Sequence, residues 1–171
     1  MTTAELLDAA LVEEATKKSG LIWVRGASGT ERALWHLWHE GAAHVVGDGP
    51  GEQPLPELVD GGAATVTVRS KDKGGRLVGW QAKVVELSPG TEAWEAAVGE
   101  LKGKRLNAPD AETMTERWSR ECRVLRLEPV GGETVPAPEG SQAAPPAASP
   151  ATTRNPVPAG LPRLLARRKK R

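Results

Sequence analysis

Three histidines and a glutamate lie within a stretch of nine residues and have the chemistry to bind a metal ion. They are His36, His39, Glu40 and His44. Imidazoles three or four residues apart on a helix share a face and can bind a common ion. On a β-strand, residues at an odd spacing point to opposite faces, so His36 and His39 would be separated. We favour a strand here, as argued below, and therefore predict no metal site.

A second candidate is the basic segment 69–76, which reads Arg-Ser-Lys-Asp-Lys-Gly-Gly-Arg between two predicted strands. Arg69, Lys71 and Arg76 could bind a phosphate or another anion together with the backbone amides of the two glycines. Asp72 lies inside this cluster, and lysines are common in turns. A solvated hairpin tip is therefore the favoured interpretation, and anion binding is the alternative.

Tryptophan is the only aromatic residue type, with six copies and no Phe or Tyr. Trp35, Trp38 and Trp80 could line a flat slot for an isoalloxazine or a similar planar ring. However, the core of this chain has no other large aromatic residue available to it. We therefore expect core packing for these three side chains and keep the slot as the alternative.

The motifs of several common enzyme classes are absent. The only cysteine, Cys122, cannot form an internal disulfide. Arginines lie nearby, but no histidine base follows at a recognisable spacing, so we expect a buried structural thiol. The chain contains no G-x-S-x-G, P-loop, C-x-x-C pair or helix opened by G-x-G-x-x-G. Hydrolase, nucleoside triphosphatase and dinucleotide-binding functions therefore lack their chemistry.

The elements that must position these residues are short strands with helices at the start of the chain and before the last strand. A capping box from Thr2 to Glu5 and a closing Gly20 predict a first helix with an apolar stripe. That stripe comprises Leu6, Leu7, Ala10, Leu11 and Ala15. Apolar runs and alternation predict strands over 21–25, 43–46, 63–69, 76–87 and 122–127, with a bend or bulge at Gly79, and helices over 91–106 and 113–119.

The segment 30–40 has conflicting signals. Its helix-forming residues, a capping box from Ser28 to Glu31 and a closing Gly41 favour a helix. Its place between two predicted strands favours an extended conformation, and an isolated helix of about ten residues would be marginal without packing. We predict the extended form. Five or six strands with helices at the ends and middle then indicate a mainly β (α+β) fold built on a small antiparallel barrel.

Composition changes sharply near residue 130. Nine prolines among many Ala, Ser and Thr follow from Pro129, so we predict one ordered domain over residues 1–128 and a disordered tail over 129–171. The tail has net charge +5 and the preceding domain has net charge −4. It ends in the cations Arg167–Arg171, which could make weak, non-specific contacts with nucleic acid, an anionic lipid surface or the acidic domain.

The overall composition also limits the location and the partners. The chain has a nearly balanced charge, with 23 basic and 22 acidic residues among 171, so no bulk field draws it to nucleic acid or membrane. Acids near the N-terminus stand where a signal peptide needs a basic flank, and no stretch of 18 apolar residues occurs. We expect a cytoplasmic protein without a membrane span.

The order of elements and some local stretches resemble the FMN-binding split-barrel superfamily, which includes pyridoxamine 5'-phosphate oxidase and deazaflavin-dependent reductases. The stretch 75–87, Gly-Arg-Leu-Val-Gly-Trp-Gln-Ala-Lys-Val-Val-Glu-Leu, is similar to the long central strand of that family. Residues 32–36 look like its strand that begins with a phosphate-contacting arginine, and residues 44–49 occupy the place of its next strand and turn. The resemblance covers about residues 5–128 and implies a six-stranded antiparallel split β-barrel with peripheral helices.

The resemblance also implies a cofactor and a set of residues that would contact it. The cofactor would be FMN or a deazaflavin in the groove of a homodimer, with haem as a less favoured alternative. The implied cofactor-binding residues are Arg32, Trp35, His36, Gly49, Gln53, Ser70 and Lys71, with Gly49 and Gln53 at the entrance of a helix. The implied activity is that of an oxidoreductase, and the sequence names neither its small-molecule substrate nor its catalytic residues.

One departure from the family keeps a second hypothesis open. Family members usually have Ser or Thr, Arg and Lys at that helix entrance, whereas this chain has Glu52, a residue that repels a phosphate. The alternative is a non-catalytic split barrel that has lost the cofactor and recruits a partner through its basic tail.

Overall fold

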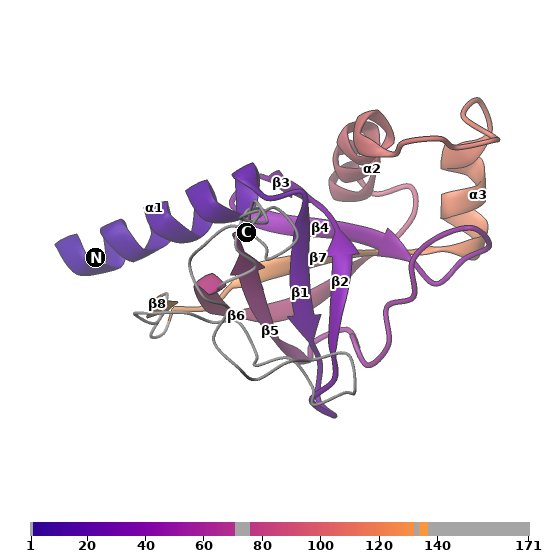
Figure 1. Ribbon diagram of the computed structural model, residues 1–171. Helices are drawn as coiled ribbons and strands as arrows, with labels where there is room; N and C mark the ends of the chain where they lie inside the picture. Colours follow the sequence, from indigo (N-terminus) through magenta and orange to yellow (C-terminus); the bar gives the residue numbers. More distant parts are fainter. Residues whose placement is uncertain (1, 71–75, 132–133, 137–171) are drawn as a thin grey trace, which may run out of the picture.

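The structure is a computed structural model that describes residues 2–70, 76–131 and 134–136. Three helices and eight strands follow one another in these ranges (Figure 1). They are α1 (Thr3–Lys18), β1 (Leu21–Arg25), β2 (Glu31–Trp35), β3 (Leu37–His39), β4 (Ala42–Gly47), β5 (Ala63–Arg69), β6 (Arg76–Leu87), α2 (Glu92–Lys104), α3 (Met114–Glu121), β7 (Arg123–Pro129) and β8 (Val135–Pro136).

A single curled antiparallel sheet organises the chain. Its order is β2-β1-β5-β6-β7-β4-β3, and β8 pairs with β6. The two edge strands of this order, β2 and β3, are consecutive in the chain and are separated only by His36. The sheet must therefore curl until its two edges meet at one residue, which produces a half-barrel.

The prediction of a mainly β fold with an antiparallel barrel is confirmed, and the extended form of residues 30–40 is confirmed as well. The described sheet has more strands than the six expected. The segment 30–40 forms two strands rather than one, because it pairs with β1 on one side of His36 and with β4 on the other. The register irregularity between β5 and β6 lies at Val68 and Arg69 rather than at the expected Gly79.

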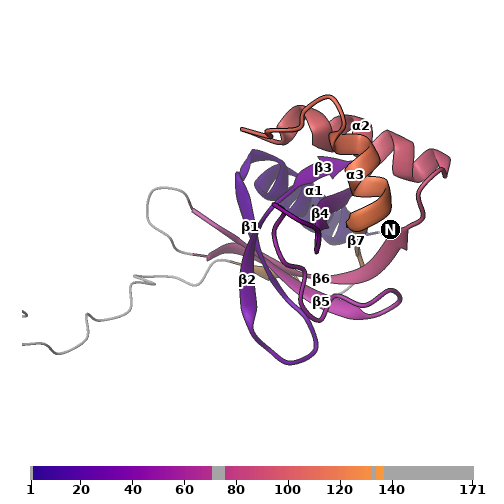
Figure 2. The ribbon, with the colours of Figure 1, turned by 90° about the vertical axis from the view of Figure 1, so that its right-hand side faces the viewer.

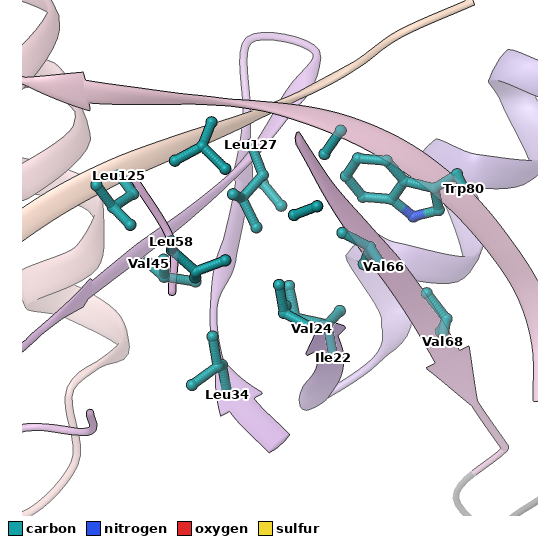
Figure 3. Close-up of a cluster of buried hydrophobic side chains, with 14 of the residues drawn as sticks. Ile22, Val24, Leu34, Val45, Leu58, Val66, Val68, Trp80, Leu125 and Leu127 are labelled. Atoms are coloured by element: carbon teal, nitrogen blue, oxygen red, sulfur yellow. The ribbon is translucent and has the colours of Figure 1, made fainter. Parts of the chain in front are cut away.

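The half-barrel encloses the first hydrophobic core (Figure 3). Side chains from β1, β2, β4, β5, β6 and β7 meet there, and they include Ile22, Leu34, Val45, Val66, Trp80, Leu125 and Leu127. Trp38 packs against this core with its ring centroid 6.1 Å from that of Trp80 in an edge-to-face arrangement. The expectation that Trp38 and Trp80 pack in the core is therefore confirmed.

A second core lies on the outer side of β3, β4 and β7, where α2 and α3 cover the sheet (Figure 2). Trp94, Val98 and Leu101 of α2 and Met114 and Trp118 of α3 are buried in it. Every residue of β4 is consequently buried, because one face of this strand contacts the first core and the other contacts the helices.

Helix α1 begins at the predicted capping box, in which Thr2 and Glu5 each bond the backbone of the other. Its predicted apolar stripe does not face the sheet. Leu6, Leu7 and Leu11 are 54%, 67% and 44% exposed, whereas Val12 and Thr16 are buried. The face that packs against the sheet carries Val12 and Thr16, which lie one above the other because they are four residues apart.

Two further expectations concern residues near or beyond position 129. Strand β7 extends to Pro129, and Val135–Pro136 pairs with β6, so regular structure continues past residue 128. The rest of the predicted tail lies outside the described residues. No described helix combines the length and the apolar character needed to cross a membrane.

We predict that Leu127→Ala lowers the free energy of unfolding by about 2–5 kcal/mol, because it leaves a cavity in the first core. Leu7→Ala is the matched control, and it should change the free energy by less than about 0.5 kcal/mol, because Leu7 is exposed on α1. Urea denaturation followed by tryptophan fluorescence measures both. Equal losses in the two variants would show that another surface covers the exposed face of α1.

Candidate functional site

An apolar surface lies on the outward side of β1 and β2. Leu21 pairs with Trp35, and Trp23 pairs with Ala33, so these four side chains share one face of the two strands. Leu21 is 49% exposed, Ala33 is exposed, and both tryptophans are half-buried. We call this set (Leu21, Trp23, Ala33 and Trp35) the outer shelf. Trp35 also packs against the second core, with its ring centroid 6.5 Å from that of Trp118, so the expected core packing of Trp35 is confirmed. The part of its ring that stays accessible lies beside Leu21, and Trp23 adds a second indole to the same face, which suits a planar ligand.

An arginine covers one of these rings. The guanidinium carbon of Arg69 lies 5.0 Å from the ring centroid of Trp23, within the range of a cation–π interaction. Arg69 also donates a hydrogen bond to the Glu31 carboxylate at 3.1 Å. Trp23 is therefore held in place by Arg69, whose charge is neutralised by Glu31. The side chain of Trp23 remains half-buried and thus partly accessible.

Two arginines of the hairpin formed by β1 and β2 have no acidic partner of this kind. Arg25 ends β1, Arg32 lies near the start of β2, and both are exposed. In the described part of the chain neither makes a hydrogen bond or an ion pair through its side chain. These two guanidiniums are thus available to an anion. Arg25 shares a face of the strands with Leu21 and Trp23, whereas Arg32 pairs with Val24 and lies on the opposite face.

The loop after β4 differs from the sequence-based prediction. Residues 48–62 contain turns but no helix, so Gly49 and Gln53 do not lie at a helix entrance. The chain here has four residues with positive φ (Asp48, Gly51, Glu57 and Gly61) and three prolines, which interrupt the helical hydrogen-bond pattern. Gly49 lies against α3: a Cβ atom at this position would stand 2.2 Å from the Cys122 sulfur.

Gln53 connects this loop to the outer shelf. Its Oε1 accepts a hydrogen bond of 2.9 Å from the backbone N–H of Trp35. Its Nε2 donates to the carbonyl oxygens of Trp35 at 2.9 Å and Val46 at 3.2 Å. Both amide hydrogens are therefore used within the protein, and Gln53 acts as a brace between the end of β2 and the end of β4.

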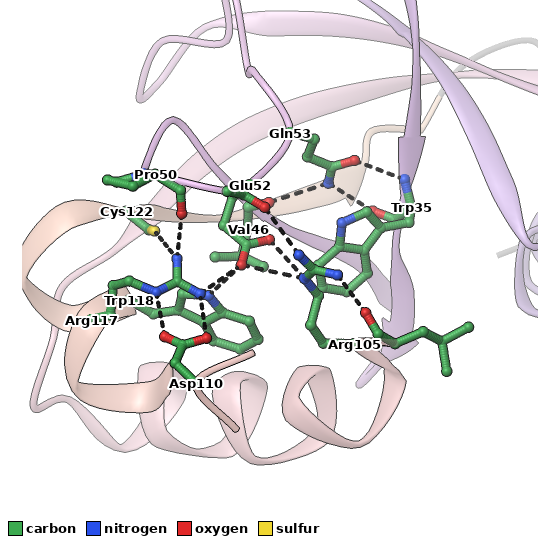
Figure 4. Close-up of polar contacts among 12 residues, drawn as sticks. Trp35, Val46, Pro50, Glu52, Gln53, Arg105, Asp110, Arg117, Trp118 and Cys122 are labelled. Carbon is green, nitrogen blue, oxygen red and sulfur yellow. Dashed lines mark hydrogen bonds and ion pairs between the residues drawn. The ribbon is translucent and has the colours of Figure 1, made fainter. Parts of the chain in front are cut away.

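Glu52 forms the centre of a buried ion cluster (Figure 4). Its side chain is fully buried and accepts hydrogen bonds from Arg105 at 3.1 Å, Arg117 at 3.0 Å and the indole N–H of Trp118 at 3.1 Å. Arg105 follows α2 and Arg117 lies in α3. The carboxylate thus ties the loop to both helices, and it occupies the two cations that lie closest to it.

Arg117 has a second acidic partner. It donates to the Asp110 carboxylate at 2.6 Å and to the Pro50 carbonyl oxygen at 2.7 Å. The hydrogen bond from Arg117 holds the pKa of Asp110 below its ordinary value. Burial raises the pKa of the Cys122 thiol, which keeps the sulfur protonated and agrees with a structural role.

The histidines do not converge on a common point. The Nε2–H of His36 donates to the Thr16 carbonyl oxygen at 2.8 Å, and burial lowers the pKa of His36. His39 and His44 form a pair with ring centroids 5.9 Å apart. Within the described ranges, no three His, Cys, Asp or Glu side chains are placed to bind one metal ion.

Of the remaining predicted residues, Ser70 and Trp35 lie at the same end of the sheet. Ser70 follows β5 directly, and Trp23 pairs with Thr67, so Ser70 lies at the end of the sheet where β1 begins. Trp35 pairs with Leu21 at that same end. Ser70 and Trp35 therefore flank β1 from opposite sides, whereas Lys71 lies outside the described residues.

Comparisons with known proteins agree with this architecture. HutZ, described as the heme storage protein from Vibrio cholerae, superposes with a TM-score of 0.53 at 12% identity, over 74% of this chain and 92% of HutZ. ChuZ from Campylobacter jejuni superposes with a TM-score of 0.50 at 9% identity, over 75% of this chain and 54% of ChuZ. The fold is the split barrel. No protein-family model and no curated protein matches the sequence.

Two features described above were not predicted from the sequence: the place of Trp23 in the outer shelf and the partners of Glu52. Trp23 belongs to the outer shelf, and the alternation of Leu21, Trp23 and Arg25 along β1 was the signal that could have identified it. The partners of Glu52 lie 53 and 65 residues further along the chain. No local pattern connects them, although an acid between glycines and prolines was an indication that Glu52 has a partner.

We predict that Glu52→Gln lowers the free energy of unfolding by about 3 kcal/mol, because it leaves two buried guanidiniums without their shared carboxylate. Urea denaturation at pH 7 is the measurement. Glu112→Gln serves as the control, since Glu112 is exposed and should tolerate the change within about 0.5 kcal/mol. A Glu52→Gln protein as stable as the wild type would contradict the anchoring role of the cluster.

A pH dependence follows from His44, whose pKa burial lowers to about 4, with smaller effects from Arg126 and His39. The unfolded chain binds a proton near pH 6.5, so the stability due to neutral His44 is complete above that pH and falls as the pH drops toward 4. We predict a loss of at most about 3 kcal/mol across this window that is absent in His44→Gln. Urea denaturation at pH 7.0, 5.5 and 4.5 measures it, and identical profiles for the two proteins would contradict the shift.

Proposed function

We propose that this split-barrel protein binds a flavin-type cofactor, FMN or a deazaflavin, against the outer shelf of a homodimer and acts as an oxidoreductase. The observation that carries the proposal is the pairing of Trp23 and Trp35 with Leu21 and Ala33 on one exposed face. Indole rings stack well on planar heteroaromatic rings. A flavin would supply hydride transfer, and the chain would supply binding, orientation and electrostatics.

The residues of the outer shelf fit the ring of such a cofactor. Its phosphate would bind at the β1–β2 hairpin rather than at the loop after β4. The loop 48–54 is a poor phosphate site, because Glu52 neutralises Arg105 and Arg117. Arg25 is exposed on the same face of β1 as the outer shelf, and Arg32 is exposed on the other face of the β1–β2 hairpin, where it pairs with Val24. Neither has an acidic partner among the described residues. The phosphate would therefore bind at this hairpin, with Arg25 on the side of the outer shelf and Arg32 as the second cation.

A dimer would complete the proposed site. The outer shelf lies on the surface of a single chain, and a partner copy packed against it would exclude water from one side of the ring. Leu21 and Leu77, both outward-facing and 49% and 44% exposed, would be covered by the same contact.

The second candidate is a split barrel that binds no cofactor and acts as an interaction module. The observation that favours it is the same buried cluster: a carboxylate fills the space between the two guanidiniums nearest the loop. Haem is a further alternative, since HutZ is described as a heme storage protein. Of the three histidines, His39 is the only one on the described surface whose side chain is not buried, with 28% exposed.

We predict that the protein binds FMN and that Trp23→Leu weakens binding of both FMN and riboflavin about tenfold, because a stacking surface is lost. The double variant Arg25→Gln with Arg32→Gln should weaken FMN and leave riboflavin unchanged, because riboflavin has no phosphate. Quenching of flavin fluorescence during titration of the full chain measures both affinities, and analytical ultracentrifugation of the same samples reports the mass.

Arg120→Gln is the control, since Arg120 is exposed on α3 and should affect neither ligand. The same titration is repeated with a deazaflavin and with haem. A chain that binds none of these ligands would contradict the cofactor proposal and favour the interaction module. Saturable binding that is insensitive to both Trp23→Leu and the arginine pair would place the cofactor away from the outer shelf.

A further inference from the structure

A groove of about 670 Å³ lies between α1 and the sheet, away from the outer shelf. Its floor is formed by Trp38 and Trp80 of the first core and by Val12 of α1. Pro129 and Val130 close one end, where β7 leaves the sheet. The floor is therefore apolar and is built from rigid elements.

The rim of this groove is acidic. Glu5, Asp8 and Glu13 of α1 line it, and none of its described lining residues is a cation. Glu5 is engaged in the capping box, and Glu13 has a weak ion pair of 4.0 Å with Lys17. Asp8 has no cationic partner among the described residues. An occupant with apolar side chains followed by positive charges would match both the floor and the rim.

A buried donor in the floor also lacks an acceptor. Trp80 is 3% exposed and lines the groove, and its Nε1–H has no hydrogen-bond partner within the described structure. A buried N–H group without an acceptor is costly. A peptide carbonyl oxygen in the groove would satisfy it, which favours a polypeptide occupant over a purely apolar ligand.

We propose that the groove is the docking site of the C-terminal segment 161–171 of the same chain. This segment reads Leu-Pro-Arg-Leu-Leu-Ala-Arg-Arg-Lys-Lys-Arg, so three leucines precede five consecutive cations. Leu161, Leu164 and Leu165 would contact the floor, and the cations would face Asp8 and Glu13 on the rim.

The position of the last described residues supports docking within one chain. Thr134 lines the groove, and the chain enters β8 directly afterwards, so the last described residue, Pro136, lies near the site. Twenty-four residues lie between Pro136 and Leu161, and this length of chain can span up to roughly 80–90 Å. A tethered segment also has an effective concentration in the mM range, so even weak contacts keep the groove filled.

Photo-cross-linking of the full chain tests this inference. A benzophenone amino acid at position 164 should form adducts with residues 5–13, 38–41, 80–81 or 129–134, identified by mass spectrometry. The same probe at position 148, within the intervening segment, should show no such preference. The pair Asp8→Lys and Glu13→Lys should reduce the adducts about fivefold, because the rim then repels the cations.

The matched control is the pair Glu100→Lys and Glu112→Lys, which reverses two exposed acids away from the groove and should leave the adduct yield unchanged. Mixing light and ¹⁵N-labelled chains distinguishes docking within a chain from docking between chains. Adducts that join light to heavy chains, that fall outside the groove, or that persist in the rim variant would overturn the proposal. The test requires no cofactor, so its outcome is independent of the proposed function.

Discussion

The passage of the chain through His36 is the constraint on which the rest of the structure depends. One continuous segment supplies both edges of the sheet, so the strands between those edges must curl into a half-barrel. The His36 ring is fixed at this point by its hydrogen bond to the Thr16 carbonyl oxygen, which also sets its tautomer as Nε2–H. The same hydrogen bond ties the end of α1 to the closure of the sheet. Closure therefore fixes where the outer shelf and the α1 groove lie.

A second constraint is electrostatic and acts on the loop between β4 and β5. Burying the Glu52 carboxylate is unfavourable by itself, and two guanidiniums and an indole N–H compensate for it. The result is a loop fastened to α2 and α3 without a helix of its own. Because these cations are already neutralised, they do not attract an anion to the outer surface of the sheet. Arg25 lies on the same face of β1 as Leu21 and Trp23 and is an exposed cation next to the outer shelf.

The fold could be predicted from sequence further than the site could. Alternation and turn residues identify β5 and β6, and the capping box identifies the start of α1, because these signals are local. The packed face of α1 was not predictable: its strongest apolar stripe is exposed, and the less apolar face carrying Val12 contacts the core. The Glu52 cluster joins three segments far apart in the chain, and only tertiary packing brings them together. The helix expected at Gly49 is absent for a local reason, because positive φ values and three prolines interrupt it.

The charge distribution separates the two candidate surfaces by the ligands they can accept. The outer shelf contains two half-buried indoles and has the exposed Arg25 beside it, which suits a planar ring that carries a negative group. The α1 groove has an acidic rim, so the same anionic ligand would be repelled there. A basic segment has the opposite preference, because Arg25 beside the outer shelf repels it and the acids of α1 attract it. One barrel can therefore present two surfaces of opposite sign, and occupation of one does not require vacancy of the other.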